Sequence, residues 1–303
     1  MPWVRRLAVA LPLTALAACG GGGSGGSSSG GGAAPVAAVQ HKQLDAGGRS
    51  RAYRVYAPPS LDSGAPPALV VVLGGYGNTA ESMVQATEFD HEAAAGGFVA
   101  AYPDGVDQTW NAGYCCGNAA RDKVDDVAFL SAMIDRVQAD YRSDPARVFV
   151  VGVSNGAMMA YRMGCELAPR IAGVGSVAGA MVLDGCHPSR PVPVIEIHGM
   201  ADPLVPFDGG ATAGGATEPS PATTAVVERW SVLDGCAAPP TVDAGNPVTT
   251  TTWTGCATGA AVRLVAIAGA GHTWYAPGLG PADGAVDATQ EMWSFFSGLR
   301  RSP

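Results

Sequence analysis

Residues 152–156 have the pattern Gly-x-Ser-x-Gly, and the sequence on either side limits how this pentad can fold. An apolar run at 147–151 precedes it and a helix-like stretch at 157–162 follows, which predicts a strand, a tight turn and a helix. In such a turn the serine has a strained backbone, and a Cβ on either flanking glycine would meet the neighbouring strand or helix. Ser154 is therefore the candidate nucleophile. A chance match in a chain with 42 glycines is the alternative, and the flanking elements disfavour it.

A serine nucleophile needs a histidine base and a carboxylate that orients the histidine. His272 is the one histidine of five beyond residue 200, and it follows the apolar run 262–267 across a short loop. Asp202 has the matching position after the run 192–198. In open α/β sheets with this kind of turn, the acid and then the histidine follow the serine along the chain. The sequence predicts a triad of Ser154, Asp202 and His272.

Each triad position has a competing interpretation. Asp184 and Asp208 are also loop acids, and Asp202 could instead close a turn before a proline. We prefer Asp202 because it directly follows the strand that should precede the base strand. His272 could be a loop histidine bonded to a backbone carbonyl. His198 precedes the acid at a strand end, so we expect it to be packed and hydrogen-bonded rather than catalytic.

Acyl transfer also requires N–H donors for the oxyanion, and one is the backbone N–H after the nucleophile, here Asn155. The second should come from the loop after an early core strand, where residues 74–78 read Gly-Gly-Tyr-Gly-Asn. We assign the Tyr76 N–H, with Gly75 as the alternative. The same glycines could also turn the chain into a helix capped by Asn78.

Apolar and helix-like segments alternate along the chain, which predicts a mostly parallel sheet flanked by helices in a single α/β domain. The expected strands lie near 51–57, 68–73, 98–102, 147–153, 173–178, 192–198 and 262–268. The expected helices cover about 79–95, 124–140, 155–168, 222–233 and 286–299.

Six blocks of the chain carry a family resemblance; they lie at 73–77, 101–105, 110–117, 124–130, 152–161 and 271–274. These blocks resemble the polyhydroxybutyrate depolymerase and feruloyl esterase family, which includes LpqC-type lipoproteins and family 1 carbohydrate esterases. The resemblance covers about residues 45–298 and implies an α/β-hydrolase fold and a secreted carboxylic-ester hydrolase. The chain departs from the family twice. It has Gly74-Gly75 where the family usually has His-Gly, and residues 274–278 replace the family's Trp-Pro-Gly.

The N-terminus indicates export. Arg5 and Arg6 precede an apolar run at 7–18 that is too short to span a bilayer and ends in small residues. Residues 16–19 read Leu-Ala-Ala-Cys, which resembles a bacterial lipoprotein cleavage box. We expect a signal peptide at 1–18, a lipidated Cys19 with a Gly/Ser-rich tether at 19–40, and a catalytic domain at 41–303. The protein would be anchored to a membrane and face the periplasm or the cell exterior. An ordinary cleaved secretion signal is the alternative.

Cysteine usage fits an oxidising compartment, because removing the lipidated residue from seven cysteines leaves six. We pair Cys236 with Cys256, which bracket a segment rich in proline and threonine that we expect to be irregular. We prefer Cys165 with Cys186, since the end of the nucleophile helix and the start of the next strand should both lie at the same edge of the sheet. The connectivity of this second pair and of the two remaining cysteines stays open.

Cysteine spacing and net charge argue against metal sites and nucleic-acid binding. Adjacent Cys115 and Cys116 lack the spacing of metal ligands, so we expect no metal, and nothing in the chain implies a cofactor. Loss of Arg5 and Arg6 with the signal leaves 16 basic against 26 acidic residues, a net charge near −10. Such a chain disfavours nucleic-acid binding, which needs clustered cations.

Two pairs of residues near the site have both functional and structural interpretations. Asp125 and Asp126 could be catalytic, but acids at the start of a helix more often stabilise its N-terminus. Trp110 and Trp274 could contact substrate or close the core. We expect substrate contact, most clearly for Trp274, which lies two residues from the base.

The sequence therefore predicts a serine carboxylic-ester hydrolase. Its substrate would be a polymer-linked or short-chain ester, either a polyhydroxyalkanoate or a feruloyl or acetyl ester of a plant polysaccharide. A serine peptidase of the same fold is an alternative, although such peptidases usually carry a gating domain. A non-catalytic surface-binding lipoprotein is disfavoured because all three triad positions are filled.

Overall fold

The structure is a computed structural model that describes residues 39–59, 61 and 64–301. The predicted signal peptide, Cys19 and all but the end of the predicted tether lie outside the described residues. The last tether residue, Gln40, already belongs to the first strand. Among the helices of the described ranges, none combines the length and apolarity that crossing a bilayer requires.

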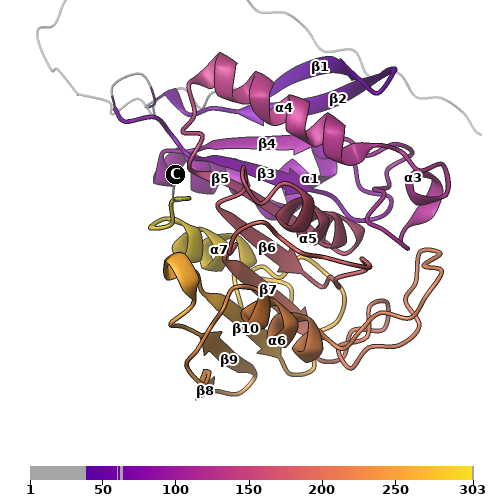
Figure 1. Cartoon of the computed structure of the whole chain (residues 1–303), viewed down its shortest axis with the longest axis vertical. Coiled ribbons are helices and arrows are strands. Elements are labelled where there is room, and N and C mark those ends of the chain that lie inside the picture. The colour runs from indigo at the N-terminus through magenta and orange to yellow at the C-terminus, as the bar shows by residue number, and fades with distance from the viewer. Residues whose placement is uncertain (1–38, 60, 62–63, 302–303) are drawn as a thin grey trace, which may run out of the picture. The chain divides into compact units, whose positions relative to one another are not determined.

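Within the described residues, one ten-stranded sheet carries the fold (Figure 1). The middle strands of this sheet run parallel and lie in the order β4-β3-β5-β6-β7-β10. The outer strands β2 and β1 on one side, and β9 and β8 on the other, are antiparallel. The bounds are β1 (Gln40–Ala46), β2 (Arg49–Tyr56), β3 (Leu69–Leu73), β4 (Val99–Pro103), β5 (Val148–Val153), β6 (Gly173–Val177), β7 (Val194–Gly199), β8 (Thr241–Ala244), β9 (Val248–Trp253) and β10 (Val262–Ile267).

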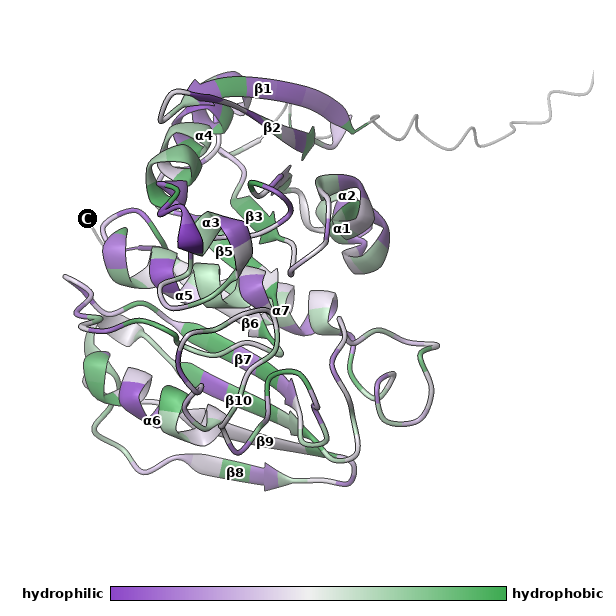
Figure 2. Ribbon diagram, turned by 90° about the vertical axis from the view of Figure 1, so that its right-hand side faces the viewer, coloured by the Kyte–Doolittle hydropathy of each residue, from purple (hydrophilic) through white to green (hydrophobic). Residues whose placement is uncertain are grey.

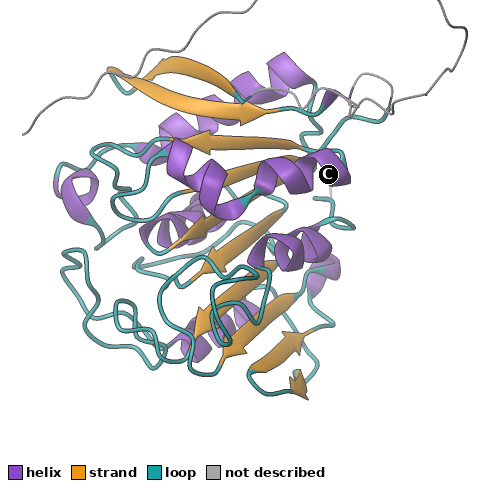
Figure 3. Ribbon diagram, turned by 180° about the vertical axis from the view of Figure 1, so that it is seen from behind, coloured by secondary structure: helices purple, strands orange, loops and turns teal. Residues whose placement is uncertain are grey.

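Helices cover both faces of this sheet (Figures 1 and 3). Helices α4, α5 and α6 share one hydrophobic core with the sheet, and α1, α2 and α7 share the other. In β3 the side chains alternate between these cores, so Leu69 and Val71 face the first and Val70 the second. The bounds are α1 (Ala80–Thr87), α2 (Phe89–Gly96), α3 (Gly117–Arg121), α4 (Asp126–Tyr141), α5 (Asn155–Glu166), α6 (Thr223–Leu233) and α7 (Ala288–Phe296).

The predicted α/β class is confirmed, and each predicted strand is present within two residues of its expected bounds. Parallel strands covered on both faces are apolar throughout, which is why they stand out in the sequence. Figure 2 shows this contrast, with largely hydrophobic central strands and a largely hydrophilic β1. The missed strands lie at the edges. β1 alternates exposed and partly buried residues, and it joins β2 through Gly47 and Gly48, both with positive φ.

The prolines of the segment between Cys236 and Cys256 suggested irregular structure, but that expectation is wrong. The segment forms the hairpin of β8 and β9. Four consecutive threonines at 249–252 make up most of β9, and β-branched residues favour extended backbone. The hairpin extends the sheet beyond β10.

The single helix expected at 79–95 is two helices. Glu88 adopts a left-handed conformation (φ 49°) between α1 and α2, and its N–H closes α1 on the Val84 carbonyl at 3.2 Å. The N-cap is Thr79 rather than Asn78, because the Thr79 hydroxyl accepts the Ser82 N–H and the Ser82 hydroxyl accepts the Thr79 N–H.

Disulfides join Cys165 to Cys186 and Cys236 to Cys256, the two pairings preferred from the sequence. The remaining pair, left open there, is a bond between the neighbours Cys115 and Cys116.

Candidate active site

Ser154 lies in the turn between β5 and α5, with φ 55° and ψ −123°. A side chain here is strained, and the flanking glycines show why the chain accepts it. A Cβ on Gly152 would lie 2.4 Å from the Gly156 carbonyl, and a Cβ on Gly156 would lie 2.3 Å from the Leu73 carbonyl oxygen. The pentad therefore packs the start of the helix directly against two strands, and Ser154 projects into a pocket.

Asp202 and His272 meet at the carboxyl ends of the neighbouring strands β7 and β10. The His272 Nδ1 lies 2.7 Å from the Asp202 Oδ2. The other carboxylate oxygen, Oδ1, accepts the N–H groups of Leu204 and Val205 at 2.8 and 2.9 Å. One oxygen therefore holds the carboxylate in its turn while the second faces the imidazole. Asp184 and Asp208, the competing acids, are exposed.

The electrostatics of Asp202 favour its ionised form. Burial alone would raise the pKa of the carboxyl, but the hydrogen bonds from His198 and His272 outweigh burial and hold that pKa well below its usual range. The two loops of the pair are also tied to each other. The Tyr275 hydroxyl accepts the Gly199 N–H at 2.6 Å and donates to the Gly271 carbonyl at 2.7 Å.

The two expected oxyanion donors flank Ser154. Asn155 is the first residue of α5, where a helix leaves its N–H groups without intrahelical partners. On the other side, a Cβ on Gly75 would lie 3.1 Å from the Ser154 Cβ, so the 74–78 loop passes directly beside the serine. Within the described residues, no hydrogen bond uses the Tyr76 N–H. The N–H groups of Asn155 and Tyr76 are therefore the candidates for an oxyanion hole.

Ser154 and His272 line the same pocket, a cavity of about 1040 Å³. No hydrogen bond joins the serine hydroxyl to the imidazole among the described residues, and this contact is often looser in unliganded enzymes. The pocket wall combines apolar side chains with acidic ones, among them Met83, Met158, Leu204, Leu279, Glu88, Glu92 and Asp287.

Comparison with known proteins shows which enzymes this chain is similar to. The Phospholipase/Carboxylesterase family matches residues 121–218, which include Ser154 and Asp202. A protein assigned as an esterase, NocK of Nocardia uniformis subsp. tsuyamanensis, is 34% identical over 258 residues, covering 78% of this chain and 74% of that protein. The chain belongs to the α/β-hydrolase esterases.

One further relative and one solved structure are similar to this esterase. Feruloyl esterase B of Piromyces equi is 31% identical over 188 residues, which cover 58% of this chain and 34% of that enzyme. The chain thus spans only about a third of the length of the Piromyces equi enzyme. Among solved structures, the acetyl xylan esterase from Aspergillus awamori aligns with a TM-score of 0.60 at 17% identity, over 78% of this chain and 94% of that one. This likeness concerns the fold.

Trp110 is a core residue of the esterase, which corrects the expectation of substrate contact. Its side chain is 1% exposed and is not part of the pocket lining. The indole N–H donates to the Gly74 carbonyl at 2.9 Å, and the Trp110 backbone exchanges hydrogen bonds with the Asn155 side chain at 2.7 and 3.0 Å. Trp110 therefore braces the 74–78 loop and Asn155 from inside the protein.

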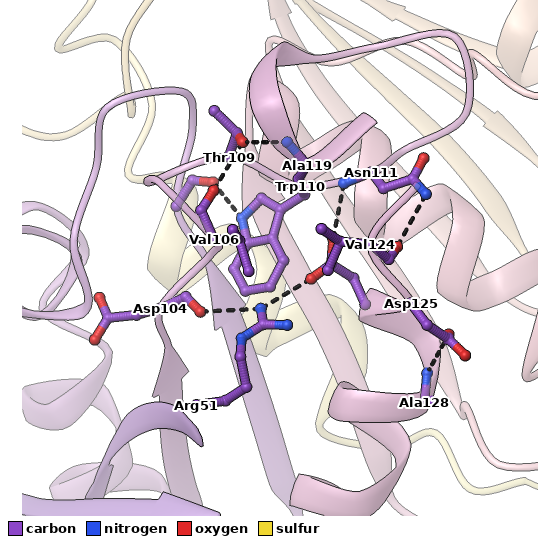
Figure 4. A network of polar contacts seen from close by, with 12 residues as sticks. Arg51, Asp104, Val106, Thr109, Trp110, Asn111, Ala119, Val124, Asp125 and Ala128 are labelled. Carbon is purple, nitrogen blue, oxygen red and sulfur yellow. Dashed lines mark hydrogen bonds and ion pairs between the residues drawn. The ribbon is translucent and has the colours of Figure 1, made fainter. Parts of the chain in front are cut away.

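A buried ion pair holds the segment that carries Trp110 (Figure 4). Arg51 on β2 contacts Asp126 at 2.8 Å and the Asp104 carbonyl at 3.2 Å. Asp126 also accepts the Asn111 N–H at 2.8 Å. Asp125 caps α4 by accepting the Ala128 N–H at 3.0 Å. Both acids have structural contacts, and the pairing of Asp126 with a distant arginine had no signal in the sequence.

Trp274 lies in the pocket wall but is only 6% exposed. Its indole N–H donates to the Thr289 hydroxyl at 3.1 Å, and its ring meets Phe89 edge-on at 5.9 Å between centroids. The pocket instead exposes Tyr76, whose side chain is 57% exposed and lies against Gly117 and Gly214. Sequence reasoning used only the Tyr76 backbone and missed this ring.

His198 is packed and hydrogen-bonded, as the sequence indicated, and it contacts Asp202 rather than the pocket. Across the described ranges, no three His, Cys, Asp or Glu side chains are grouped so that they could hold a metal ion.

Proposed function

We propose that this esterase hydrolyses carboxylic esters through an acyl-enzyme on Ser154, with His272 as the base and Asp202 as the acid that orients it. The observation that carries the proposal is the 2.7 Å contact between His272 Nδ1 and Asp202 Oδ2 beside a pocket that Ser154 lines. This contact leaves the second ring nitrogen, Nε2, available for the serine hydroxyl.

The reaction then follows from the positions of these groups. Ser154 Oγ attacks the ester carbonyl carbon while His272 Nε2 takes the hydroxyl proton. The carbonyl oxygen becomes an oxyanion, and the N–H groups of Tyr76 and Asn155 stabilise it. Collapse breaks the bond to the alcohol, which leaves with the proton from His272. Water then attacks the acyl-enzyme carbonyl and gives its proton to His272. Collapse breaks the bond to the Ser154 oxygen, which takes the proton back from His272, and the acid is released.

For the substrate class, we favour feruloyl or acetyl groups ester-linked to a plant polysaccharide. The names of relatives, feruloyl esterase and acetylxylan esterase, support this choice, and a pocket of about 1040 Å³ has room for an aromatic acyl group with part of a sugar chain. A panel of methyl ferulate, acetylated xylan, polyhydroxybutyrate and a peptide amide separates the classes. Turnover confined to polyhydroxybutyrate or to the peptide would overturn the polysaccharide assignment.

The role of Trp274 is tested by Trp274→Ala. If the ring borders the acyl group, the variant should lose about tenfold on methyl ferulate, roughly the worth of one aromatic contact, and keep its rate on p-nitrophenyl acetate. The matched control is Trp293→Ala, since Trp293 packs on Phe98 outside the pocket. Equal losses of Trp274→Ala on both substrates would instead make Trp274 a structural support for His272.

We also propose that the esterase is exported and anchored by a lipid on Cys19. The cleavage box at 16–19 supports this proposal, and the three disulfides fit an oxidising compartment. Mass spectrometry of the N-terminal peptide is the test. Acyl chains on Cys19 are expected, and a mature N-terminus without them would contradict the anchor.

A further inference from the structure

A chain of buried polar side chains leads from the triad acid into the protein interior. The Tyr161 hydroxyl donates to Glu196 Oε2 at 2.8 Å, and Glu196 Oε1 lies 3.0 Å from His198 Nδ1. His198 Nε2 lies 3.3 Å from Asp202 Oδ2, the oxygen that also meets His272. Tyr161, Glu196 and His198 are 0% exposed. Glu196 and His198 are two residues apart on β7, so their side chains share one face of the sheet.

The contacts of His198 determine how many protons it carries. Its Nδ1 faces the Glu196 carboxyl group, with the Thr223 hydroxyl at 3.3 Å, and its Nε2 faces the Val205 carbonyl at 2.9 Å as well as Asp202. A neutral imidazole has a single N–H, so one nitrogen would present its lone pair to acceptors, either the Glu196 carboxylate or the Val205 carbonyl with the Asp202 carboxylate. An imidazolium satisfies both sides. Burial alone would lower the pKa of His198, but the hydrogen bonds to Asp202 and Glu196 raise it to about 9.

We propose that Glu196 and His198 are positioning residues that form a buried ion pair behind the triad, holding Asp202 in place and keeping a fixed positive charge beside it. The inference rests on the proposed function of Asp202 and His272. His198 and His272 contact the same carboxylate oxygen, so the contacting nitrogens lie within about 6 Å of each other. A fixed cation at that distance adds a positive potential at the imidazole that accepts the serine proton.

Other ionisable groups surround the two histidines and stay constant in the test. Tyr275 ties the loops of Asp202 and His272, and Asp283 accepts the Gly271 N–H at 2.8 Å. The remaining ionisable groups line the same pocket as His272; they are Glu88, His91, Glu92 and Asp287. A variant that changes only Glu196 therefore isolates the effect of the buried pair.

The decisive variant is Glu196→Gln. Its amide oxygen can still accept from Tyr161, and its N–H can donate to His198 Nδ1, so His198 becomes neutral with little change of shape. The variant thereby loses the fixed cation within about 6 Å of the base, and the acid limb of kcat/KM should move up by about one pH unit. At a pH on that limb the variant should be about tenfold slower than the unmodified enzyme, with each rate taken relative to its own plateau. Glu228→Gln removes an exposed charge on α6 and should leave the limb in place.

Nitrogen NMR of the histidines gives a readout that needs no turnover. In the protein with Ser154→Ala, His198 should show two protonated ring nitrogens through pH 8, and adding Glu196→Gln should make it neutral at pH 7. A neutral His198 at pH 7 with Glu196 intact, or an unshifted acid limb in folded Glu196→Gln, would overturn the inference. If Glu196→Gln does not fold, the His198 signals with Glu196 intact decide. Ester turnover that survives Ser154→Ala would instead refute the proposed function and leave the NMR result standing.

Discussion

Replacing Ser154 or His272 with alanine should reduce ester turnover by about 10⁴-fold or more, while the protein remains folded. Triad members act as a unit, so either loss removes the activated nucleophile and leaves only the oxyanion donors and substrate binding. Neither side chain fills the core, because Ser154 lies at the pocket surface and the His272 side chain is 13% exposed. Circular dichroism should therefore match that of the unmodified enzyme.

The measurement is kcat/KM on p-nitrophenyl acetate, with His187→Ala as the matched control because His187 is exposed and outside the pocket. The control should keep full activity. A folded Ser154→Ala or His272→Ala enzyme that retains more than about a tenth of the rate would refute the catalytic assignment.

Asp202→Asn should cost about 10⁴-fold in kcat through the wrong histidine tautomer. The Leu204 and Val205 N–H groups hold Oδ1, so the new amide NH₂ must replace Oδ2 and point at His272 Nδ1. His272 would then accept at Nδ1 and carry its proton on Nε2, which can no longer take the serine proton.

Asp184→Asn and Asp208→Asn make the same chemical change at exposed carboxylates and serve as controls. Both should stay close to the unmodified rate. A larger loss in either control than in Asp202→Asn would assign the acid to that residue instead.

The turn that carries Ser154 and the central sheet could be predicted because local sequence specifies them. Ser154 lies between a fully apolar strand and a helix with glycines on both sides, a pattern that few other structures require. The order of Asp202 and His272 followed from parallel strands, whose carboxyl ends lie at one edge of the sheet.

The features that were missed depend on partners far away in the chain. The edge strand β1 alternates exposed and partly buried residues, β8 is exposed throughout and β9 is mostly partly buried, and none of them has a continuous apolar run. The left-handed Glu88 that divides α1 from α2 is not a glycine, so the break had no residue signal. The sequence places Trp110 near Ser154 and so suggests substrate contact, but it carries no signal that the ring is buried behind Gly74.

The buried pair behind the triad shows the same limit. Glu196 and His198 are the polar residues of a fully buried strand, and a charge there is a signal that burial must be compensated. Its partner His198 was expected to be packed and hydrogen-bonded. Only the structure places Glu196, His198 and Asp202 in contact along one line.

Covalent capture of Ser154 tests the central claim most directly. A fluorophosphonate should transfer its phosphonyl group to the Ser154 oxygen, with loss of fluoride and of the hydroxyl proton, because only an activated serine displaces fluoride rapidly. Intact-mass analysis should then show one adduct per chain, and peptide mapping should place it on Ser154, with none in Ser154→Ala. An adduct on another residue, or labelling that persists in Ser154→Ala, would contradict the account.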